Sequence, residues 1–508
     1  MPDPQAADEL PRTVPAALQR AARTWPERPA YVDDDRTLTF GELLDAVREA
    51  ARGYVALGLA PGDRVVVWGP NSIAWVVRAL AASYAGGVLV PANSRYTGHE
   101  VADLVTRTHA RLAVVDDGFL GRSQAAELDA AGVGDCMILR MGEELDPGEV
   151  SADAVDARAG AVDPDDVADV LFTSGTTGRS KGAMSAHRQT VGVARAWGEL
   201  GGVTADDRYL VVNPFFHSFG YKAGIMVGLT TGATLHPVAT FDLDETMGII
   251  EQERITVLPG APTIYQSLLD APGRADRDLS SLRLAVTGAA VVPVALIQQM
   301  RDELAIDTVV TAFGMTEAVV VTMCRPDDDS ETVATTCGRA IPGMEITTGD
   351  RDELLVRGEF VMLGYLDDPE ATAEAIDGEG WLHTGDVARI DERGNLAITD
   401  RLKDMYISGG FNVYPAEVEQ ALAGHAGVVE AAVVGVPDRR LGEVGKAFVV
   451  RRDPDLTADD VIGFARERLA NFKVPREVEF AEALPRNLSG KVLKTELRQA
   501  TGGDRDGS

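Results

Sequence analysis

The sequence predicts an α/β protein of two domains, a large N-terminal α/β domain over residues 1–400 and a smaller α+β domain over residues 401–508. At 508 residues, the chain is longer than one hydrophobic core usually serves. Short apolar runs alternate with helical periodicity, as in parallel sheets covered by helices. The charged stretch Asp400–Asp404 then precedes a segment of about a hundred residues, an ordinary size for a domain.

The first elements follow from periodicity and turn residues. Helices are expected where apolar residues recur every three to four positions, and strands where short apolar runs end at Gly, Pro or Asp. Between residues 116 and 162 the periodicity is weak, and we expect one helix and then an acidic linker. The pattern predicts helices at 14–22, 41–57 and 72–85, a hairpin of strands 30–32 and 38–40, and strands at 64–68, 87–91 and 112–115.

The same alternation continues further along the chain. Beyond Thr335, short strands and turns indicate a small β subdomain. In the C-terminal domain, helices are expected at 415–423 and 458–470 and strands at 431–434 and 447–450. In the remainder of the N-terminal domain we expect strands at 167–172, 209–212, 234–237, 256–258, 282–287 and 308–311, with helices at 189–199, 223–229 and 243–252.

Composition and charge argue against several classes of protein. A formal net charge of −31 argues against nucleic acid and anionic membrane surfaces as partners. The three cysteines are odd in number and lack metal-ligand spacing, which indicates reduced thiols in a cytoplasmic protein. The N-terminus is polar, which argues against a secretion signal. The sequence has no run of about eighteen apolar residues, which argues against a membrane span.

The stretch Thr173–Gly182 directly follows an apolar strand and carries glycines, hydroxyls and a lysine. Glycines let the backbone approach a ligand, hydroxyls donate to phosphate oxygens, and lysine adds a positive charge. It is not a Walker A loop, because its inner glycines lie too close together and glycine follows the lysine. A flexible linker is the alternative, although linkers seldom leave a buried strand. We predict a polyphosphate-binding loop containing Thr173, Ser174, Gly175, Thr176, Thr177, Gly178 and Lys181.

Further candidates follow other strands, because ligands of α/β sheets collect at the carboxyl ends of strands. The strand at 209–212 leads to His217, which lies among Phe216, Phe219 and Tyr221; a histidine satisfied in the core is the alternative. The strand at 282–287 ends in three small residues that leave room for a flat ring, Gly288, Ala289 and Ala290.

The strand at 308–311 leads to an aromatic ring, a hydroxyl and a carboxylate in close succession. Phe313 could stack on a base, and Glu317 could hold the magnesium that accompanies a polyphosphate. For Glu317, a solvated helix start is the alternative. The candidate segment consists of Ala312, Phe313, Gly314, Met315, Thr316 and Glu317.

Lysine is scarce, with only seven in the chain, so each one is of interest. Lys491 ends the loop Pro485–Lys491 near the C-terminus. Lys222 directly follows the aromatic segment; we interpret it as a surface charge, with a role beside a substrate ketone or carboxylate as the alternative.

Together these segments resemble the adenylate-forming superfamily, which includes acyl- and aryl-CoA synthetases, luciferases and peptide-synthetase adenylation domains. Phe215–Gly224 and Arg401–Ile407 look like the corresponding segments of actinobacterial CoA ligases for the ring-bearing propanoate left after sterol degradation has removed the A and B rings. At Phe313 many relatives carry tyrosine. Phenylalanine can still stack on a base, and only the phenolic hydrogen bond is lost. The resemblance covers nearly the whole chain and depends on six segments in the family's order: 173–182, 213–220, 312–317, 381–386, 400–404 and 485–491.

The resemblance implies an AMP-forming acid:CoA ligase that uses ATP, Mg²⁺ and coenzyme A. It first makes an acyl-adenylate and then transfers the acyl group to CoA. The loop at 173–182 would cradle the β- and γ-phosphates, Glu317 the magnesium, and Lys491 the carboxylate and bridging oxygens. The adenine would be framed by Gly288, Ala289, Ala290 and Phe313, and the ribose would be held by Asp386 and Arg401.

The resemblance also implies a mobile C-terminal domain. It would swing about a hinge at Lys403, removing Lys491 and bringing in the face that carries Gly409 and Gly410. His217 and its aromatic neighbours would line the acyl pocket or gate the approach of the thiol. A homodimer is left open.

The identity of the acid depends on the pocket. The aromatic set around His217 suggests a broad apolar pocket rather than a narrow tube. Together with the family resemblance, this favours the bicyclic keto-propanoate over a straight chain. Alternatives are a ligase for fatty or aryl acids and a stand-alone adenylation enzyme that loads a carrier protein. A nucleotide-binding scaffold without activity is disfavoured, because Lys491, Glu317 and Asp386 are all present.

Overall fold

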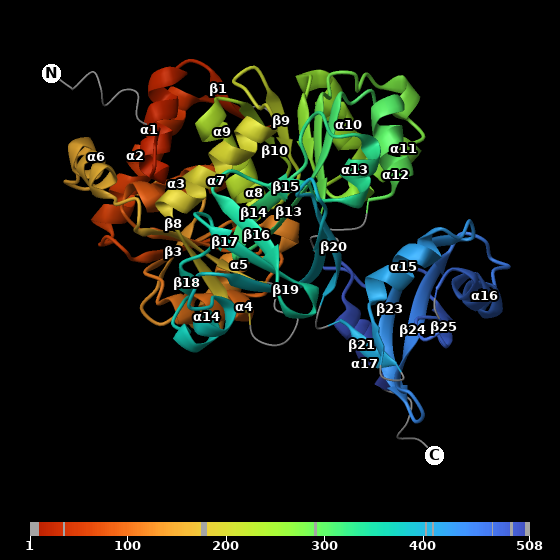
Figure 1. Cartoon of the computed structure of the whole chain (residues 1–508). Coiled ribbons are helices and arrows are strands. Elements are labelled where there is room, and N and C mark those ends of the chain that lie inside the picture. Colours follow the sequence, from red (N-terminus) through yellow and green to blue (C-terminus); the bar gives the residue numbers. More distant parts are fainter. Residues whose placement is uncertain are drawn as a thin grey trace.

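The chain forms a large body of three sheets and, beside strand β20 (Leu396–Arg401), a smaller body built on a fourth sheet (Figure 1). The computed structural model describes residues 10–33, 36–173, 180–288, 292–401, 404–408, 411–469, 471–487 and 491–502, with only the backbone of residues 401, 411, 412, 501 and 502. The predicted α/β class, with a large N-terminal part and a small C-terminal part, is confirmed.

The first sheet has nine described strands with a parallel centre and antiparallel edges. The central strands β9 to β13 and β1 pair in parallel, and both faces bury apolar side chains. In spatial order the strands are β15 (Arg339–Ala340), β14 (Ala318–Met323), β13 (Thr308–Met315), β12 (Leu284–Gly288), β11 (Val257–Pro259), β9 (Arg208–Val211), β10 (Thr234–Pro237), β1 (Pro29–Asp33) and β2 (Arg36–Thr39).

The second sheet has seven described strands and carries the predicted phosphate loop. Its strands β4, β3, β5 and β6 are parallel with β7, and β8 and β18 close one edge in antiparallel pairs. The spatial order is β18 (Gly364–Tyr365), β8 (Gly182–Ala186), β7 (Val167–Phe172), β4 (Val88–Ala92), β3 (Arg64–Trp68), β5 (Leu112–Val115) and β6 (Met137–Arg140).

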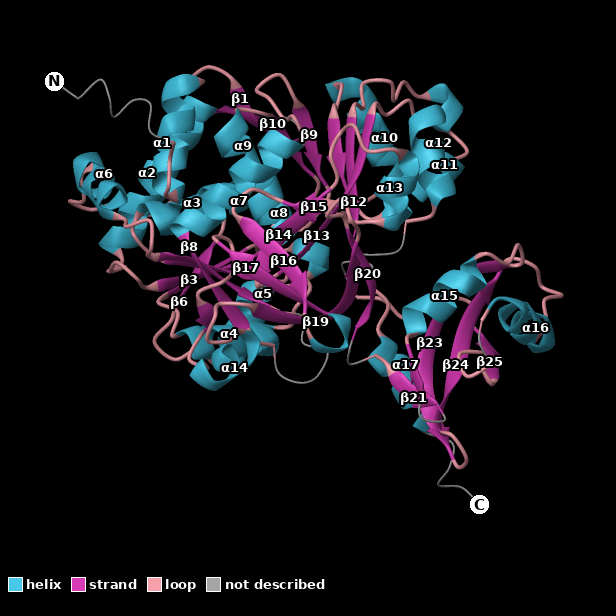
Figure 2. Cartoon of the chain, in the orientation of Figure 1, coloured by secondary structure: helices cyan, strands magenta, loops and turns pink. Residues whose placement is uncertain are grey.

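Helices lie around the strands of the large body (Figure 2). Helix α2 shows why they form: Thr39 and Glu42 make a capping box at its start, and its apolar face packs into the core. The helices of this body are α1 (Val14–Thr24), α2 (Phe40–Ala56), α3 (Ile73–Tyr84), α4 (Gly98–Thr108), α5 (Gln124–Ala131), α6 (Ala152–Ala161), α7 (His187–Leu200), α8 (Ser218–Gly220), α9 (Met226–Thr231), α10 (Leu243–Glu253), α11 (Pro262–Asp270), α12 (Val294–Asp302), α13 (Ser330–Thr335) and α14 (Pro369–Ala375).

The remaining sheets are antiparallel except for one edge strand. The third sheet is β16 (Met344–Thr348), β17 (Glu353–Gly358), β19 (Leu382–Ile390) and β20. The fourth carries α15 (Pro415–Ala423), α16 (Ala458–Arg468) and α17 (Lys494–Gly502) beside β22 (Phe411–Val413), β21 (Tyr406–Ser408), β24 (Gly442–Arg451), β23 (Val428–Asp438) and the parallel edge strand β25 (Glu477–Phe480). Asp400 on β20 contacts helix α15 of the smaller body, because its carboxylate accepts a hydrogen bond from the Ala416 N–H at 3.0 Å.

One expectation about local structure is wrong, and another is confirmed with a difference in helix type. The predicted acidic linker before residue 162 instead contains strand β6 and helix α6. Helix α6 buries only Val155 and Ala159, so its apolar pattern is too short to be recognised. The predicted helix at 223–229 is confirmed, but it begins as a π-helical turn, η3 (Tyr221–Ile225), and continues as α9.

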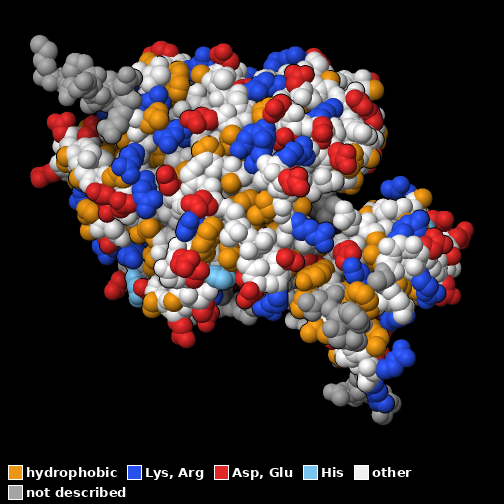
Figure 3. All heavy atoms as spheres, viewed as in Figure 1, with side chains coloured by type: hydrophobic (Ala, Val, Ile, Leu, Met, Phe, Trp, Pro, Cys, Tyr) orange, Lys and Arg blue, Asp and Glu red, His pale blue; other side chains and the backbone are white. Residues whose placement is uncertain are grey.

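Charged side chains of both signs lie on the surface. Acidic and basic side chains are interspersed over the face in Figure 3, without one large basic area on that face. Among the described residues, no helix is both long enough and apolar enough to cross a membrane.

Candidate active site

The two ends of the predicted phosphate loop are held together by β7 and β8. The Thr173 N–H donates to the Lys181 carbonyl oxygen at 2.8 Å, and the Lys181 N–H donates to Thr173 Oγ1 at 3.2 Å. These bonds continue the antiparallel ladder between the strands. The predicted phosphate contacts Ser174, Gly175, Thr176, Thr177 and Gly178 lie outside the described residues.

Lys181 and Glu317 approach the same tyrosine. The Lys181 ammonium lies 4.9 Å from the centroid of the Tyr365 ring, a cation–π contact. Tyr365 Oη donates a hydrogen bond to Glu317 Oε1 at 2.7 Å. Tyr365 is brought here because β18 pairs with β8, directly after the phosphate loop. The structure therefore connects the predicted phosphate loop to the predicted magnesium ligand.

Glu317 is buried in the turn of the hairpin between β13 and β14, with 9% of its surface exposed. The alternative of a solvated helix start is therefore wrong. Its backbone carbonyl accepts a hydrogen bond from the Met362 N–H at 2.7 Å. Burial, together with the charge of Glu317 and the hydrogen bond to it, raises the pKa of the Tyr365 hydroxyl, which therefore remains a donor.

The residues present fit a magnesium ion that is shared with a nucleotide. Magnesium in phosphate sites is usually held by one or two carboxylates together with phosphate oxygens and water. Tyr365 engages only Oε1 of Glu317, and the carboxylate lies beside the tyrosine that contacts Lys181 of the phosphate loop. Glu317 could therefore supply the protein carboxylate.

The predicted adenine edge is shaped by close backbone packing. Gly288 and Ala312 are directly opposite on β12 and β13, and a Cβ on Gly288 would lie 2.8 Å from the Ala312 carbonyl oxygen. A Cβ on Gly314 would lie 1.8 Å from the Val319 carbonyl oxygen, so the hairpin requires glycine there. Phe313 is half-buried on β13. Ala289 and Ala290 lie outside the described residues.

The two predicted ribose-binding positions are brought together by one strand pair. Asp386 on β19 and Arg401 on β20 are direct cross-strand partners. Asp386 is buried, with 1% of its surface exposed, and its N–H donates to Thr384 Oγ1 at 3.1 Å. The Arg401 side chain is outside the described structure.

The aromatic segment before α9 separates into buried and partly exposed residues. Tyr221 is buried, whereas Phe216 and Phe219 are half-buried, and Phe219 packs edge-on against Trp197 at a centroid distance of 5.2 Å. His217 is exposed, so it is not a core histidine, and its Nδ1 accepts a hydrogen bond from the Phe219 N–H at 3.2 Å. Desolvation by the surrounding protein nevertheless lowers the pKa of its imidazole.

The interpretation of Lys222 as a surface charge is wrong. Its side chain is 2% exposed and lies on η3. Its ammonium is 3.0 Å from Asp169 Oδ1 and donates to Ser185 Oγ at 2.7 Å. These contacts also leave the alternative of a direct role beside the substrate without support.

Lys491 lies at the end of a loop that is closed by an isolated antiparallel bridge between Arg486 and Val492. The Asn487 N–H donates to the Lys491 carbonyl oxygen at 2.9 Å, and the Lys491 N–H donates to Asn487 Oδ1 at 2.9 Å. These two bonds hold the base of the loop. The predicted hinge and thiol-facing residues Lys403, Gly409 and Gly410 lie outside the described residues.

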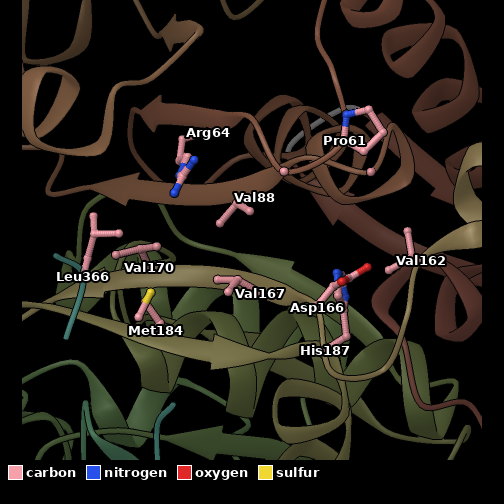
Figure 4. Close-up of a pocket in the computed structure, with 12 residues that line it drawn as sticks. Pro61, Arg64, Val88, Val162, Asp166, Val167, Val170, Met184, His187 and Leu366 are labelled. Atoms are coloured by element: carbon pink, nitrogen blue, oxygen red, sulfur yellow. The ribbon is translucent and has the colours of Figure 1, made fainter. Parts of the chain in front are cut away.

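A cavity of about 420 Å³ lies elsewhere in the second sheet (Figure 4). Arg64, Val88 and Val167, the first residues of β3, β4 and β7, line it together with His187 and Asp166. The phosphate loop leaves the opposite end of β7, and none of the predicted site residues lines this cavity. It is therefore not the predicted acyl pocket.

Two residues of this region were missed in the sequence. Tyr365 belongs to a two-residue strand, too short to show periodicity. Asp169 interrupts the apolar run of β7, and it is fully buried. A lone carboxylate inside such a run is a usable signal, since buried acids need a partner.

Comparison with known proteins gives consistent matches over nearly the whole chain. The family model described as AMP-binding enzyme matches residues 18–366, and that of the AMP-binding enzyme C-terminal domain matches residues 417–491. A Rhodococcus jostii protein named 3-[(3aS,4S,7aS)-7a-methyl-1,5-dioxo-octahydro-1H-inden-4-yl]propanoyl:CoA ligase is 58% identical over 510 residues, covering 97% of this chain and 99% of the relative. A Mycobacterium tuberculosis protein of the same name is 56% identical over 501 residues, covering 96% and 99%. The crystal structure of ATP-bound MatB from Rhodopseudomonas palustris matches with a TM-score of 0.84 and 30% identity, covering 97% of this chain and 99% of that one.

Proposed function

The chain belongs to the AMP-binding enzyme family, and from this premise we propose that it is an ATP-dependent acid:CoA ligase for a bicyclic dioxo-propanoate. The observation that carries the proposal is the 58% identity, over 97% of the chain, to a relative whose name specifies this acid and this reaction. A second relative with the same name, at 56% identity, supports it.

In the first half-reaction, an oxygen of the substrate carboxylate bonds to the α-phosphorus of ATP, and pyrophosphate leaves. The protein must hold two anions in line and offset their charge. Lys181 and the loop between β7 and β8 would bind the β- and γ-phosphates, and Lys491 would bind the carboxylate and bridging oxygens. When bound, magnesium would neutralise phosphate oxygens, held by the Glu317 carboxylate that Tyr365 orients.

In the second half-reaction, the CoA sulfur bonds to the acyl carbon and AMP leaves. We propose that residues 401–508 form a domain that turns about Lys403 between the two steps. The separate C-terminal sheet supports this division, because it shares no described strand with the sheets of residues 10–401. Phe216, His217 and Phe219 would line the acid pocket, and Asp386 with Arg401 would hold the ribose.

Substrate comparison tests the acid. We expect the bicyclic dioxo-propanoate to give a higher kcat/KM than octanoate, palmitate or 4-hydroxycinnamate. A hydrophobic pocket discriminates by about 10–200-fold for each methylene-sized mismatch, so several mismatches should separate these acids clearly. A straight-chain or planar aromatic acid that equals the bicyclic acid would overturn the proposed substrate and leave the ligase activity standing.

The products distinguish the ligase from a carrier-loading enzyme. Incubation with ATP, acid and CoA should yield AMP, pyrophosphate and acyl-CoA in equal amounts. If the enzyme made acyl-adenylate but no acyl-CoA, transfer to a carrier protein would become the better proposal.

A further inference from the structure

We propose that Lys222 is a positioning residue that ties the segment lining the acid pocket, residues 213–221, to both strands that frame the phosphate loop. The inference deepens the proposed function, on which its catalytic consequence rests. The structure supplies a direct chain of contacts between the two regions, and the Lys222 ammonium is engaged by Asp169 and Ser185 inside the protein.

The contacts centre on a buried carboxylate. The Lys222 ammonium lies 3.0 Å from Asp169 Oδ1 and donates to Ser185 Oγ at 2.7 Å. The other carboxylate oxygen, Asp169 Oδ2, accepts a hydrogen bond from Thr190 Oγ1 at 2.6 Å. Asp169 lies on β7 before the loop, and Ser185 on β8 after it. One ammonium group therefore contacts the strand on each side of the phosphate loop.

The acid-pocket segment is compact and is held at both ends: Asn71 Oδ1 accepts a hydrogen bond from the Phe215 N–H at 2.7 Å near its start, and Lys222 anchors its end. The Tyr221 N–H donates to the His217 carbonyl oxygen at 2.9 Å, directly before Lys222. A Cβ on Gly220 would lie 2.1 Å from the Pro214 carbonyl oxygen, so the segment folds tightly against itself. The π-helical turn η3 then places Lys222 inside the protein. Such turns occur often at functional sites.

Stability alone is a poor explanation for this ion pair. Lys222 is 2% exposed and Asp169 is fully buried, so both charges have lost their hydration. Burial lowers the pKa of Lys222, and the charge of Asp169 opposes that change. Apolar residues of similar volume often stabilise a protein as well as a buried ion pair does, whereas a charged pair fixes one geometry. The geometry fixed here is the position of the acid pocket relative to the phosphate loop.

That relative position matters for adenylation. The attacking carboxylate and the α-phosphate must be aligned, and a misplacement of about 1 Å can cost about a hundredfold in rate. Loss of the link should therefore lower the rate of acid attack. ATP binding should change little, because the β7–β8 ladder holds the phosphate loop without Lys222.

The test removes both charges together, because a single substitution would leave one buried charge without its partner. In the double variant Asp169→Asn/Lys222→Met, the asparagine still offers an oxygen to Thr190. The matched control is Asp207→Asn/Arg283→Met, which removes another ion pair. Its residues lie just before the starts of β9 and β12, whereas the predicted site residues follow the carboxyl ends of the strands. Both variants are checked for folding by circular dichroism and thermal unfolding.

ATP–pyrophosphate exchange is measured with the acid that the wild-type enzyme uses best. For Asp169→Asn/Lys222→Met, we expect kcat/KM for the acid to fall by about tenfold or more, with the KM for ATP within about threefold of wild type. In the control variant, kcat/KM for the acid and the KM for ATP should both stay within about twofold of wild type. A folded double variant with unchanged kcat/KM for the acid would overturn the inference, as would an equal loss in the control.

Hydrogen exchange separates a failure of this inference from a failure of the proposed function. Without substrates, the double variant should exchange the Phe219 and Tyr221 amide protons at least about tenfold faster than wild type, and the control variant should not. If the wild-type enzyme activated none of the acids, the proposed function would fail. The exchange rates alone would then decide whether Lys222 positions the segment 213–221. Unchanged protection at both amides would then overturn the inference.

Discussion

Tyr365 Oη lies 2.7 Å from Glu317 Oε1, while the ring of the same tyrosine lies 4.9 Å from the Lys181 ammonium. One side chain therefore contacts the lysine of the phosphate loop and the carboxylate proposed to hold magnesium. The hydroxyl fixes the carboxylate, and the ring face accommodates the cation. These two contacts can be separated by mutation, because phenylalanine keeps the ring and loses the hydroxyl.

Tyr365→Phe should raise the magnesium concentration needed for half-maximal adenylation by about 10–100-fold, the usual cost of losing a group that orients a metal ligand. The reason is that Glu317 loses the donor that fixes Oε1. Magnesium titration at constant ATP measures the effect. Tyr54→Phe is the control, since that hydroxyl donates to the Arg78 carbonyl far along the chain from these residues. An unchanged magnesium requirement in Tyr365→Phe would contradict the assignment of Glu317.

Lys491→Ala should lower adenylation by several orders of magnitude and leave thioester formation from a supplied acyl-adenylate largely intact. The lysine charge is needed only while the α-phosphate is attacked, so it stabilises one of two transition states. Lys494→Ala is the control, because Lys494 forms an ion pair with Glu419 at 2.7 Å in the same part of the chain. Equal losses in both half-reactions of Lys491→Ala would refute the two-state assignment.

Lys403→Pro should allow acyl-adenylate formation and abolish most thioester formation. Proline fixes φ at the proposed hinge, which traps a domain that must rotate. Lys403→Ala removes the same charge and keeps the backbone free, so it should retain both half-reactions. Quench-flow measurement of acyl-adenylate and acyl-CoA separates the steps, and normal turnover in the proline variant would exclude a hinge at this residue.

His187 should make the stability of the large body fall below neutral pH. Its side chain is 1% exposed, its Nδ1 accepts a hydrogen bond from the Val14 N–H at 3.3 Å, and burial lowers its pKa from 6.5 to about 4. Between these pH values the unfolded chain binds a proton that the native chain does not, so stability decreases as pH falls from 6.5 to about 4. The full effect is about 3 kcal/mol.

His187→Gln keeps an acceptor for Val14 and cannot be protonated in this range. The variant should therefore show a smaller decrease in the urea midpoint between about pH 7 and about pH 5 than wild type does. His99→Gln, at an exposed histidine of helix α4, should leave the decrease unchanged. If the urea midpoint of His187→Gln fell with pH as steeply as that of wild type, another group would cause the pH dependence.

Local chemistry was enough to predict much of the fold and to indicate candidate residues for the site. The helix at 415–423 has the predicted bounds, since proline at its start and apolar spacing are properties of the chain itself. Strand ends and residue types indicate the phosphate loop and Glu317 as candidates, whereas the ribose pair follows only from the family resemblance. Helix α6 was missed because two buried residues make no visible period.

Contacts between distant segments could not be read in this way. Nothing local places Tyr365 beside Glu317, because a two-residue strand acquires its position only by pairing with β8. Lys222 looks like a surface charge in the sequence, and it becomes an internal one only because Asp169 lies on a neighbouring element to neutralise it. The sequence by itself determined the elements, the family resemblance and the types of group in the site, since these depend on neighbouring residues. Only the tertiary structure decided which charges are buried and which groups meet, because burial and partnership depend on packing between segments far apart in the chain.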